Sequence, residues 1–318
     1  MISTTAVIPD DRSTVVLRSG ELTLELAPLI GGSISRFYSV RDGAQFHWLR
    51  PATDEALSMR EPEAMASSPL IPFCNRIRNG RAEFQGRELV LPPNRGNSPH
   101  AIHGMAWKRQ WSVVERDARS ARLELDYPRD DWPYHFRATQ EFEVRDDHLT
   151  VHIAVENLDS RTMPVGIGHH PYLPHRPNTR LTVSLSQMWQ GDAEVMPTGL
   201  ETPPLLERLR AGTCLRDVVQ DNNFIGWNRF ARVDWPATTD HPFDAALTMT
   251  AESPLDFFVL YSPADEDFFC IEPVSNCTDW LNLGEYSIRQ RGGAVIAPGE
   301  VYRASFTLVP QWGDTVRS

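Results

Sequence analysis

The sequence predicts an all-β protein made of antiparallel strands, and three observations support this prediction. Apolar and polar residues alternate with a period of two in many short segments, which is the pattern of a half-buried strand. Turn-forming residues such as Asp146, Asn178 and Gly299 separate these segments. Helical periodicity is scarce. Many short strands without intervening helices indicate a sandwich or a barrel.

The alternating segments recur along the chain, and the clearest predicted strands cover residues 22–26, 122–127, 149–155, 181–185 and 247–250. A short helix is predicted over residues 54–65, with an interruption near Pro62. A hairpin with a glycine turn is predicted over residues 84–89. Residues 197–215 are the least strand-like and are predicted to run over the surface. We expect residues 1–318 to form one continuous domain.

Composition bounds the class of protein. The chain has 318 residues, of which 41% are hydrophobic and 23% are charged, as in a soluble globular protein. Its formal net charge of −11 disfavours nucleic acid as a partner, because a phosphate backbone binds a basic surface. No apolar run is long enough to span a bilayer, so no membrane partner is expected.

Location and assembly are predicted only in outline. Residues 1–18 lack the pattern of a signal peptide. The four cysteines form no CxxC pair, and reduced thiols are their simplest state. We therefore expect a cytoplasmic protein. Its oligomeric state is left open between a monomer and a homodimer.

Two adjacent histidines, His169 and His170, end an apolar run that starts at Val165. If this run is extended, His170 shares a face with Gly166 and Gly168, whereas His169 lies on the opposite face. Glycine in a strand marks a close approach by a ligand or by another backbone. His170 is thus a candidate acid or base facing a cleft. The alternative is a buried, hydrogen-bonded histidine pair at a turn.

A glutamate ends another strongly apolar strand. Glu272 precedes Pro273, which favours an extended backbone. A carboxylate in this position either pairs with a cation or takes part in chemistry, because burying an unpaired charge is costly. Burial would raise its pKa and make it a better base. The alternative is a structural ion pair, for example with Arg76. Asp279 is expected to brace the following loop.

Three further motifs offer polar groups to a ligand. Asn75 and Arg76 follow an apolar run bounded by prolines, and arginine presents a rigid fork of donors to ligand oxygens. His103 precedes a glycine and two tryptophans, whose rings would stack on a sugar. Asp221 would accept hydrogen bonds from two hydroxyl groups. Each motif has a structural alternative: a surface ion pair for Arg76, a capping role for His103 and a turn for Asp221.

A metal site is also considered, because His100 and His103 are separated by two residues. Zinc sites need three or four convergent ligands. The sequence has no HExxH motif and no clustered framework of cysteine and histidine. We therefore predict no metal site.

These motifs occur in the order seen in the aldose 1-epimerases, also called galactose mutarotases. The similarity runs from Gly31 to Pro310 and covers most of the chain. The ordered set is specific, whereas no single motif is decisive. The set comprises Asn75-Arg76-Ile77, the hairpin near Gly86, His103-Gly104, His170-x-Tyr172, Asp221 and Glu272.

The resemblance implies a large antiparallel β-sandwich of the galactose mutarotase type, or supersandwich. It implies an isomerase that interconverts the α and β anomers of a free aldose without a cofactor. Glu272 resembles the general base on the C1 hydroxyl, His170 the general acid on the ring oxygen, and His103 a second site histidine. The residues that resemble sugar-binding positions are Arg76, Asn75, Asp221 and Tyr172.

The chain also departs from the family pattern. His169 stands where the family often has asparagine, and Leu173 stands where an aromatic residue often follows the tyrosine. These departures leave the identity of the sugar open.

Two alternative functions remain at this stage. Related sugar-phosphate epimerases carry extra arginines, and Arg78 and Arg81 keep a hexose 6-phosphate substrate as one alternative. The other is a non-catalytic carbohydrate-binding protein on the same fold. The presence of both Glu272 and His170 argues against it, since binding alone needs no acid–base pair.

Overall fold

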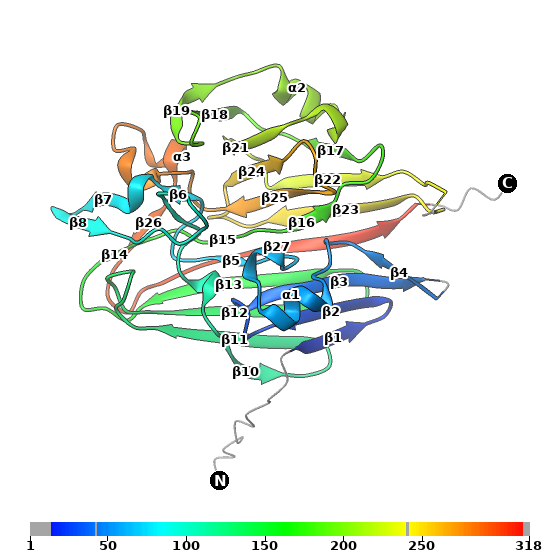
Figure 1. Cartoon of the computed structure of the whole chain (residues 1–318), viewed down its shortest axis with the longest axis horizontal. Coiled ribbons are helices and arrows are strands. Elements are labelled where there is room, and N and C mark those ends of the chain that lie inside the picture. The colour runs from blue at the N-terminus through cyan, green and yellow to red at the C-terminus, as the bar shows by residue number, and fades with distance from the viewer. Residues whose placement is uncertain (1–13, 42, 240–241, 314–318) are drawn as a thin grey trace, which may run out of the picture.

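A computed structural model describes residues 14–41, 43–239 and 242–313. In these ranges the chain is almost entirely β, and neighbouring strands pair antiparallel in sheets of nine, eight and four strands with three small two-stranded sheets (Figure 1). The prediction of a large antiparallel all-β sandwich is confirmed. The prediction that no signal peptide is present rests largely on residues 1–13, which lie outside the described ranges.

The last described strand of the chain, β27, lies in the middle of the nine-stranded sheet. β27 pairs with β13 on one side and with β23 on the other. In sheet order the strands are β10 (Ser112–Arg116), β11 (Ser120–Tyr127), β12 (Phe136–Val144), β13 (Leu149–Asn157), β27 (Val301–Trp312), β23 (Ala245–Ala251), β22 (Phe230–Trp235), β17 (Arg180–Val183) and β20 (Thr213–Cys214).

The eight-stranded sheet carries most of the candidate site. Its order is β19 (Pro197–Glu201), β18 (Gln187–Gly191), β21 (Gln220–Ile225), β24 (Phe257–Ser262), β25 (Phe268–Val274), β15 (Gly168–His169) and β5 (Pro69–Leu70), and β16 (Tyr172–Pro174) pairs with β25 beside β15.

The remaining strands form a four-stranded sheet and three small pairs. The four-stranded sheet contacts β11 and β12 through its first two strands (Figure 1). It comprises β1 (Val15–Ser19), β2 (Leu22–Ala27), β3 (Ser33–Arg41) and β4 (Ala44–His47). The small pairs are β14 (Met163–Val165) with β26 (Ala294–Ile296), β6 (Arg76–Ile77) with β9 (Ala101–Ile102), and β7 (Arg81–Phe84) with β8 (Arg87–Val90).

Helices are few and short in the described ranges. They are α1 (Asp54–Met59), α2 (Leu205–Arg210) and α3 (Ile288–Arg291), with a 3₁₀ turn at Pro62–Ala64. The predicted interruption of the first helix near Pro62 is confirmed, because α1 ends at Met59 and the 3₁₀ turn begins at the proline. The predicted hairpin at residues 84–89 is also confirmed, as β7 and β8 turn at Gly86.

Strand alternation decides which side chains enter the core. Along β12 every second residue is buried, from Phe136 to Val144, and β13 repeats the pattern. One continuous apolar core joins these faces to the other sheets. Its largest fully buried side chains include Trp48, Trp132 and Trp235.

The prediction for residues 197–215 is partly wrong. Pro197–Glu201 forms β19, which pairs with β18 at the edge of the eight-stranded sheet, and Thr213–Cys214 forms β20 at the edge of the nine-stranded sheet. Proline is compatible with an edge strand because no ladder hydrogen bond is needed on its outer side. Between the two strands, Leu206 and Leu209 of α2 are buried.

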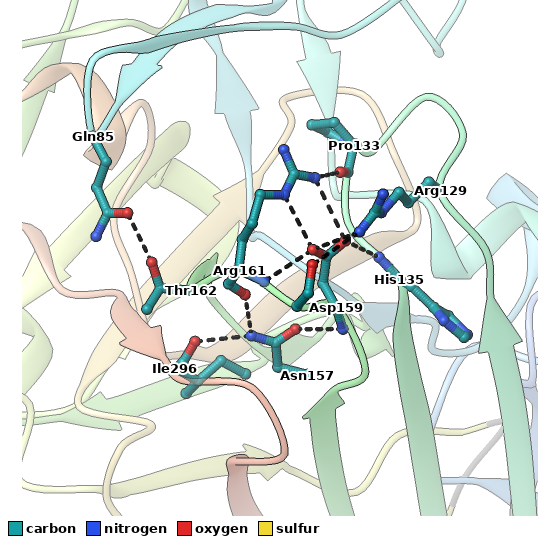
Figure 2. A network of polar contacts seen from close by, with 10 residues as sticks. Gln85, Arg129, Pro133, His135, Asn157, Asp159, Arg161, Thr162 and Ile296 are labelled. Atoms are coloured by element: carbon teal, nitrogen blue, oxygen red, sulfur yellow. Dashed lines mark hydrogen bonds and ion pairs between the residues drawn. The ribbon is translucent and has the colours of Figure 1, made fainter.

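A buried carboxylate ties together the loops around the end of β13 (Figure 2). The side chain of Asp159 is fully buried and accepts hydrogen bonds from Arg129 Nε at 2.6 Å and from Arg161 Nε at 3.1 Å. The backbone N–H of His135 also donates to it, at 3.2 Å. Burial opposes ionisation, but the hydrogen bonds from the two arginines outweigh it. The pKa of Asp159 therefore lies well below its ordinary value.

Candidate active site

Backbone register places three predicted site residues on one face of the eight-stranded sheet. On β25, Glu272 stands two residues from Cys270. Cys270 pairs with Tyr172 on β16 and with Tyr261 on β24, and Tyr261 pairs with Asp221 on β21. Directly paired residues, and residues two apart on one strand, point to the same face. Glu272, Tyr172 and Asp221 therefore share a face.

His170 and Glu272 are in direct contact on this face. The distance between His170 Nε2 and Glu272 Oε1 is 3.2 Å, and the two side chains are only 9% and 2% exposed. The His170 ring stacks on Tyr172, with ring centroids 4.6 Å apart. The edge of His103 lies against it at 5.1 Å and at 86°. The structure thus brings both predicted proton-transfer residues and the second histidine together.

Left-handed backbone positions bring two distant loops to this pair. Asn75 has φ 59° and His103 has φ 62°, in a region where asparagine and histidine are enriched among non-glycine residues. The N–H of His103 donates to the carbonyl of Asn75 at 2.8 Å. Beside this bond, Arg76 pairs with Ile102 in the β6–β9 ladder. The two motifs therefore lie side by side.

Arg76 forms its ion pair with Asp221 and not with Glu272. Arg76 Nη2 lies 3.3 Å from Asp221 Oδ2. The alternative of a structural ion pair between Glu272 and Arg76 is therefore wrong. Asp279 braces the adjoining loop as expected, because its backbone N–H donates to the carbonyl of Arg76 and its side chain accepts from the backbone N–H of Arg78.

Several buried polar atoms in this cleft have no hydrogen-bond partner among the described residues. Most buried polar atoms in proteins are hydrogen-bonded, so such a concentration marks a place where a polar ligand would bind. Four of the seven predicted site residues contribute one atom each: Asn75 Nδ2, His103 Nδ1, His170 Nδ1 and Glu272 Oε2.

Burial sets the proton affinities in the cleft. Burial, and secondly the negative charge of Asp221, raise the pKa of Glu272 well above its ordinary value. Burial, and secondly the positive charge of Arg95, lower the pKa of His170. Burial and the neighbouring His170 likewise lower the pKa of His103. In both groups burial therefore disfavours the charged form, and because they are in contact they titrate as one coupled pair.

A cavity opens next to His170 and contains residues that the sequence did not reveal as site residues. It has a volume of about 310 Å³, counting space open to solvent, and its lining includes His103, His170, Glu63, Arg95 and Trp107. Arg95 Nε lies 3.0 Å from Glu63 Oε2. Trp107 follows His103 in the motif, but Arg95 lies in a polar loop and Glu63 in a 3₁₀ turn, with no local signal for a site.

The two adjacent histidines face opposite ways, as strand alternation predicts. His169 is fully buried, and its Nδ1 contacts Ser67 Oγ while its Nε2 lies 3.0 Å from Gln140 Oε1. Its ring also lies 5.4 Å from that of Phe306 on β27. Burial lowers the pKa of His169 to about 3, so it is a neutral hydrogen-bonding link between the sheets.

The glycines beside His170 mark a close approach by other parts of the protein, which was one of the two predicted alternatives, and do not open toward a cleft. A Cβ on Gly166 would lie 1.9 Å from Asn276 Oδ1, and one on Gly168 would lie 2.8 Å from the carbonyl oxygen of Pro273. Neighbouring parts of the protein therefore occupy the space at both glycines. The apolar run from Val165 to His170 is also not one continuous strand, because β14 ends at Val165 and β15 begins at Gly168.

Replacing His169 tests its structural role. We expect His169→Ala to lower the free energy of unfolding by about 2 kcal/mol or more, because it leaves Ser67 and Gln140 with unpaired buried atoms and opens a cavity. Denaturant unfolding of the variant and of the wild type measures this difference. An unchanged free energy of unfolding would contradict the assignment.

The remaining polar candidates are engaged outside the cleft. Arg78 pairs with Asp192 at 3.2 Å, and Arg81 pairs with Glu88 across the β7–β8 hairpin. His100 accepts a hydrogen bond from the backbone N–H of Asn79. In the described part of the chain, no three histidine, cysteine, aspartate or glutamate side chains are grouped to hold a metal ion. Nor does any described helix have the length and apolarity needed to cross a membrane.

The structure is that of an antiparallel β-sandwich protein with a buried histidine–glutamate contact on one sheet face, and comparisons with known proteins identify its family. The family model described as aldose 1-epimerase matches residues 13–308. The chain therefore belongs to the aldose 1-epimerase family, and its fold is the β-sandwich of the galactose mutarotase type.

Individual relatives agree with this assignment. The chain is 32% identical over 305 residues to the uncharacterized protein YphB of Escherichia coli (strain K12), covering 93% of this chain and 98% of YphB. A crystal structure from the same organism, described provisionally as an aldose 1-epimerase, superposes with a TM-score of 0.82 at 28% identity and covers 94% of this chain and 99% of its own. A galactose mutarotase-like protein from Clostridium acetobutylicum has a TM-score of 0.80 at 19% identity, with 94% and 95% covered, and so shares the fold.

Proposed function

We propose that this protein interconverts the α and β anomers of a free aldose by acid–base ring opening. The observation that carries the proposal is the 3.2 Å contact between His170 Nε2 and Glu272 Oε1, buried beside unpaired polar atoms. Ring opening needs one proton removed from the C1 hydroxyl and one delivered to the ring oxygen. A carboxylate and an imidazolium in contact supply both.

In the proposed reaction the Glu272 carboxylate takes the proton of the C1 hydroxyl while His170 gives its proton to the ring oxygen O5. The C1–O5 bond breaks, and C1 becomes an aldehyde. Rotation about C1–C2 presents the other face of the aldehyde to O5, and the reverse proton transfers close the ring. The reaction only redistributes protons, so it needs no cofactor.

The burial of the pair is consistent with this cycle. Ring opening leaves Glu272 protonated and His170 neutral, which is the distribution that burial favours in the free protein. Since the two groups touch, the proton can pass between them without leaving the cleft. We assign His103 to polarising the ring oxygen, and the hydroxyl-binding roles to Arg76, Asn75, Asp221 and Tyr172.

Replacing Asp221 should change the pH dependence of kcat/KM. The reaction needs one proton on the pair, so activity falls at alkaline pH when this proton is lost. Asp221 helps to raise the pKa of Glu272. In Asp221→Asn the proton is therefore lost at lower pH, and we expect the alkaline limb of kcat/KM to move down by about one pH unit at most. The exposed Asp217→Asn is the control, and a limb that stays in place or moves up contradicts the assignment.

Two alternatives make different predictions. A hexose 6-phosphate epimerase would use free arginines, but Arg78 and Arg81 are held by carboxylates. A non-catalytic sugar-binding protein would show affinity without anomerisation.

Polarimetry on freshly dissolved α-anomers tests the three functions together. We expect the wild type to accelerate the change of rotation for at least one neutral aldose. Conversion no faster than in buffer for every aldose tried would overturn the proposal. Faster conversion of a hexose 6-phosphate than of the parent sugar would favour the first alternative.

A further inference from the structure

Arg95 and Glu63 line the same cavity as two residues that the proposed reaction uses. Their ion pair, 3.0 Å from Nε to Oε2, lines the same cavity as His103 and His170. The two side chains are 36% and 45% exposed, so they stand at the mouth of the cavity. The proposed chemistry assigns no role to either of them.

The backbone around this pair is fixed. The side-chain amide of Asn94 donates to the carbonyls of Ile102 and Gly104 and accepts from the N–H of Ile102. It therefore ties the loop that carries Arg95 to the residues on either side of His103. On the other side, Arg50 donates to the carbonyl of Met65 at 3.1 Å, next to the turn that carries Glu63. Both side chains thus project from anchored segments.

The chemistry of a pyranose indicates which part of the sugar meets this pair. The ring oxygen O5 is bonded to C1 and to C5. If O1 faces Glu272 and O5 faces His170, then C5 and its substituent extend past His170, into the cavity with Arg95 and Glu63. The C2 side of the ring extends the opposite way, where Asp221 lies across β24 from β25.

A neutral hydroxymethyl group matches this end of the cavity. Its hydroxyl accepts a hydrogen bond from the Arg95 guanidinium and donates one to the Glu63 carboxylate. The ring of Trp107, which lines the same cavity, offers an apolar surface to the methylene. An anionic group on C6 would lie against Glu63, whose charge already compensates that of Arg95.

We propose that Arg95 and Glu63 are specificity-determining residues that bind the hydroxymethyl group on C5, so that the protein prefers neutral hexoses to pentoses. This inference rests on the proposed epimerase function. It adds the substrate class, which that function leaves open.

Matched sugars isolate this contact. D-Glucose and D-xylose differ only in the hydroxymethyl group on C5, and D-galactose and L-arabinose form a second such pair. Mutarotation kinetics give kcat/KM for each sugar with the wild type, Arg95→Ala and Glu63→Ala, starting from anomers with the same arrangement at C1: the α-anomer of the three D-sugars and the β-anomer of L-arabinose. Arg81→Ala, which breaks a similar ion pair on the β7–β8 hairpin, is the control.

We expect the wild type to prefer the hexose in at least one pair. Arg95→Ala should reduce that preference about tenfold, since a hydrogen bond to a charged group is lost for the hexose. Loss of the Arg95 charge also acts on the pKa of His170, but that effect is the same for both sugars and cancels in their ratio. Glu63→Ala should act in the same direction, and Arg81→Ala should leave the preference unchanged. A loss of stability would change the rates for both sugars equally and would leave their ratio intact.

Three results would overturn the inference. Equal losses for hexose and pentose in Arg95→Ala would show that the pair does not contact C6, while anomerisation itself would stand. A higher kcat/KM for D-glucuronate or D-glucose 6-phosphate than for D-glucose would show that the end of the cavity binds an anion. No anomerisation of any sugar would instead overturn the proposed function, and this inference with it.

Discussion

Glu272→Gln is expected to slow anomerisation by about 10³-fold, within the range of 10²–10⁴ that a general acid or base supplies. The amide keeps the size of the carboxyl group but cannot take the proton of the C1 hydroxyl. Burial raises the pKa of Glu272 and therefore favours its neutral form. The uncharged amide should fit the same site. Polarimetry at saturating sugar gives kcat.

Folding of this variant is monitored separately. We expect its unfolding midpoint to stay within a few degrees of the wild type. Glu83→Gln, an exposed change on β7, should alter neither property. A Glu272→Gln variant that is folded and retains most of its kcat would remove Glu272 from the chemistry.

Asp159→Ala is expected to lower the free energy of unfolding by about 2–3 kcal/mol, because it removes a fully buried acceptor and leaves a backbone N–H and two arginines without it. The lost acceptor serves Arg129, Arg161 and the backbone N–H of His135 (Figure 2). Denaturant titration monitored by tryptophan fluorescence measures the change.

A surface ion pair of the same length provides the control. Arg109 and Asp130 are also 2.6 Å apart, but Asp130 is 51% exposed, so Asp130→Ala should cost about 0–1 kcal/mol. If Asp159→Ala and Asp130→Ala lowered the free energy of unfolding equally, burial would not be the reason that the Asp159 network stabilises the protein.

The low pKa of Asp159 adds a pH dependence. Its stabilising contribution is complete above the unfolded pKa of about 3.9 and is lost as the pH falls toward the lower folded value. The difference in stability between the wild type and Asp159→Ala should therefore shrink below about pH 4. A difference that grows in acid would contradict this sign.

Local pattern was enough to predict much of the fold. Period-two alternation marks strands such as β11 and β13, and it correctly separates the face of His170 from that of His169. The pairing of β27 with both β13 and β23 joins segments that are far apart in sequence. No local pattern encodes this order, because it depends on which apolar faces fit together.

The candidate site shows the same limit. Glu272 and His170 stand out in the sequence because polar groups in apolar runs need a reason to be buried. The prediction that Glu272 ends its strand is wrong, because β25 continues to Val274. Arg95 and Glu63 meet only through the packing of a loop against a 3₁₀ turn, and each looks like an ordinary surface residue in the sequence. The side chain that fills the space at Gly166, Asn276, comes from a distant loop, so no local pattern could identify which group approaches this glycine.

In the proposed function, the contacting pair of His170 and Glu272 opens and closes an aldose ring. Two-dimensional proton exchange spectroscopy on an equilibrated aldose tests it most directly, because it follows the α and β anomeric protons without a coupled reaction. We predict exchange cross-peaks with the wild type and their loss with Glu272→Gln. Sugar binding by the wild type, with exchange no faster than in buffer, would contradict the claim and identify a carbohydrate-binding protein instead.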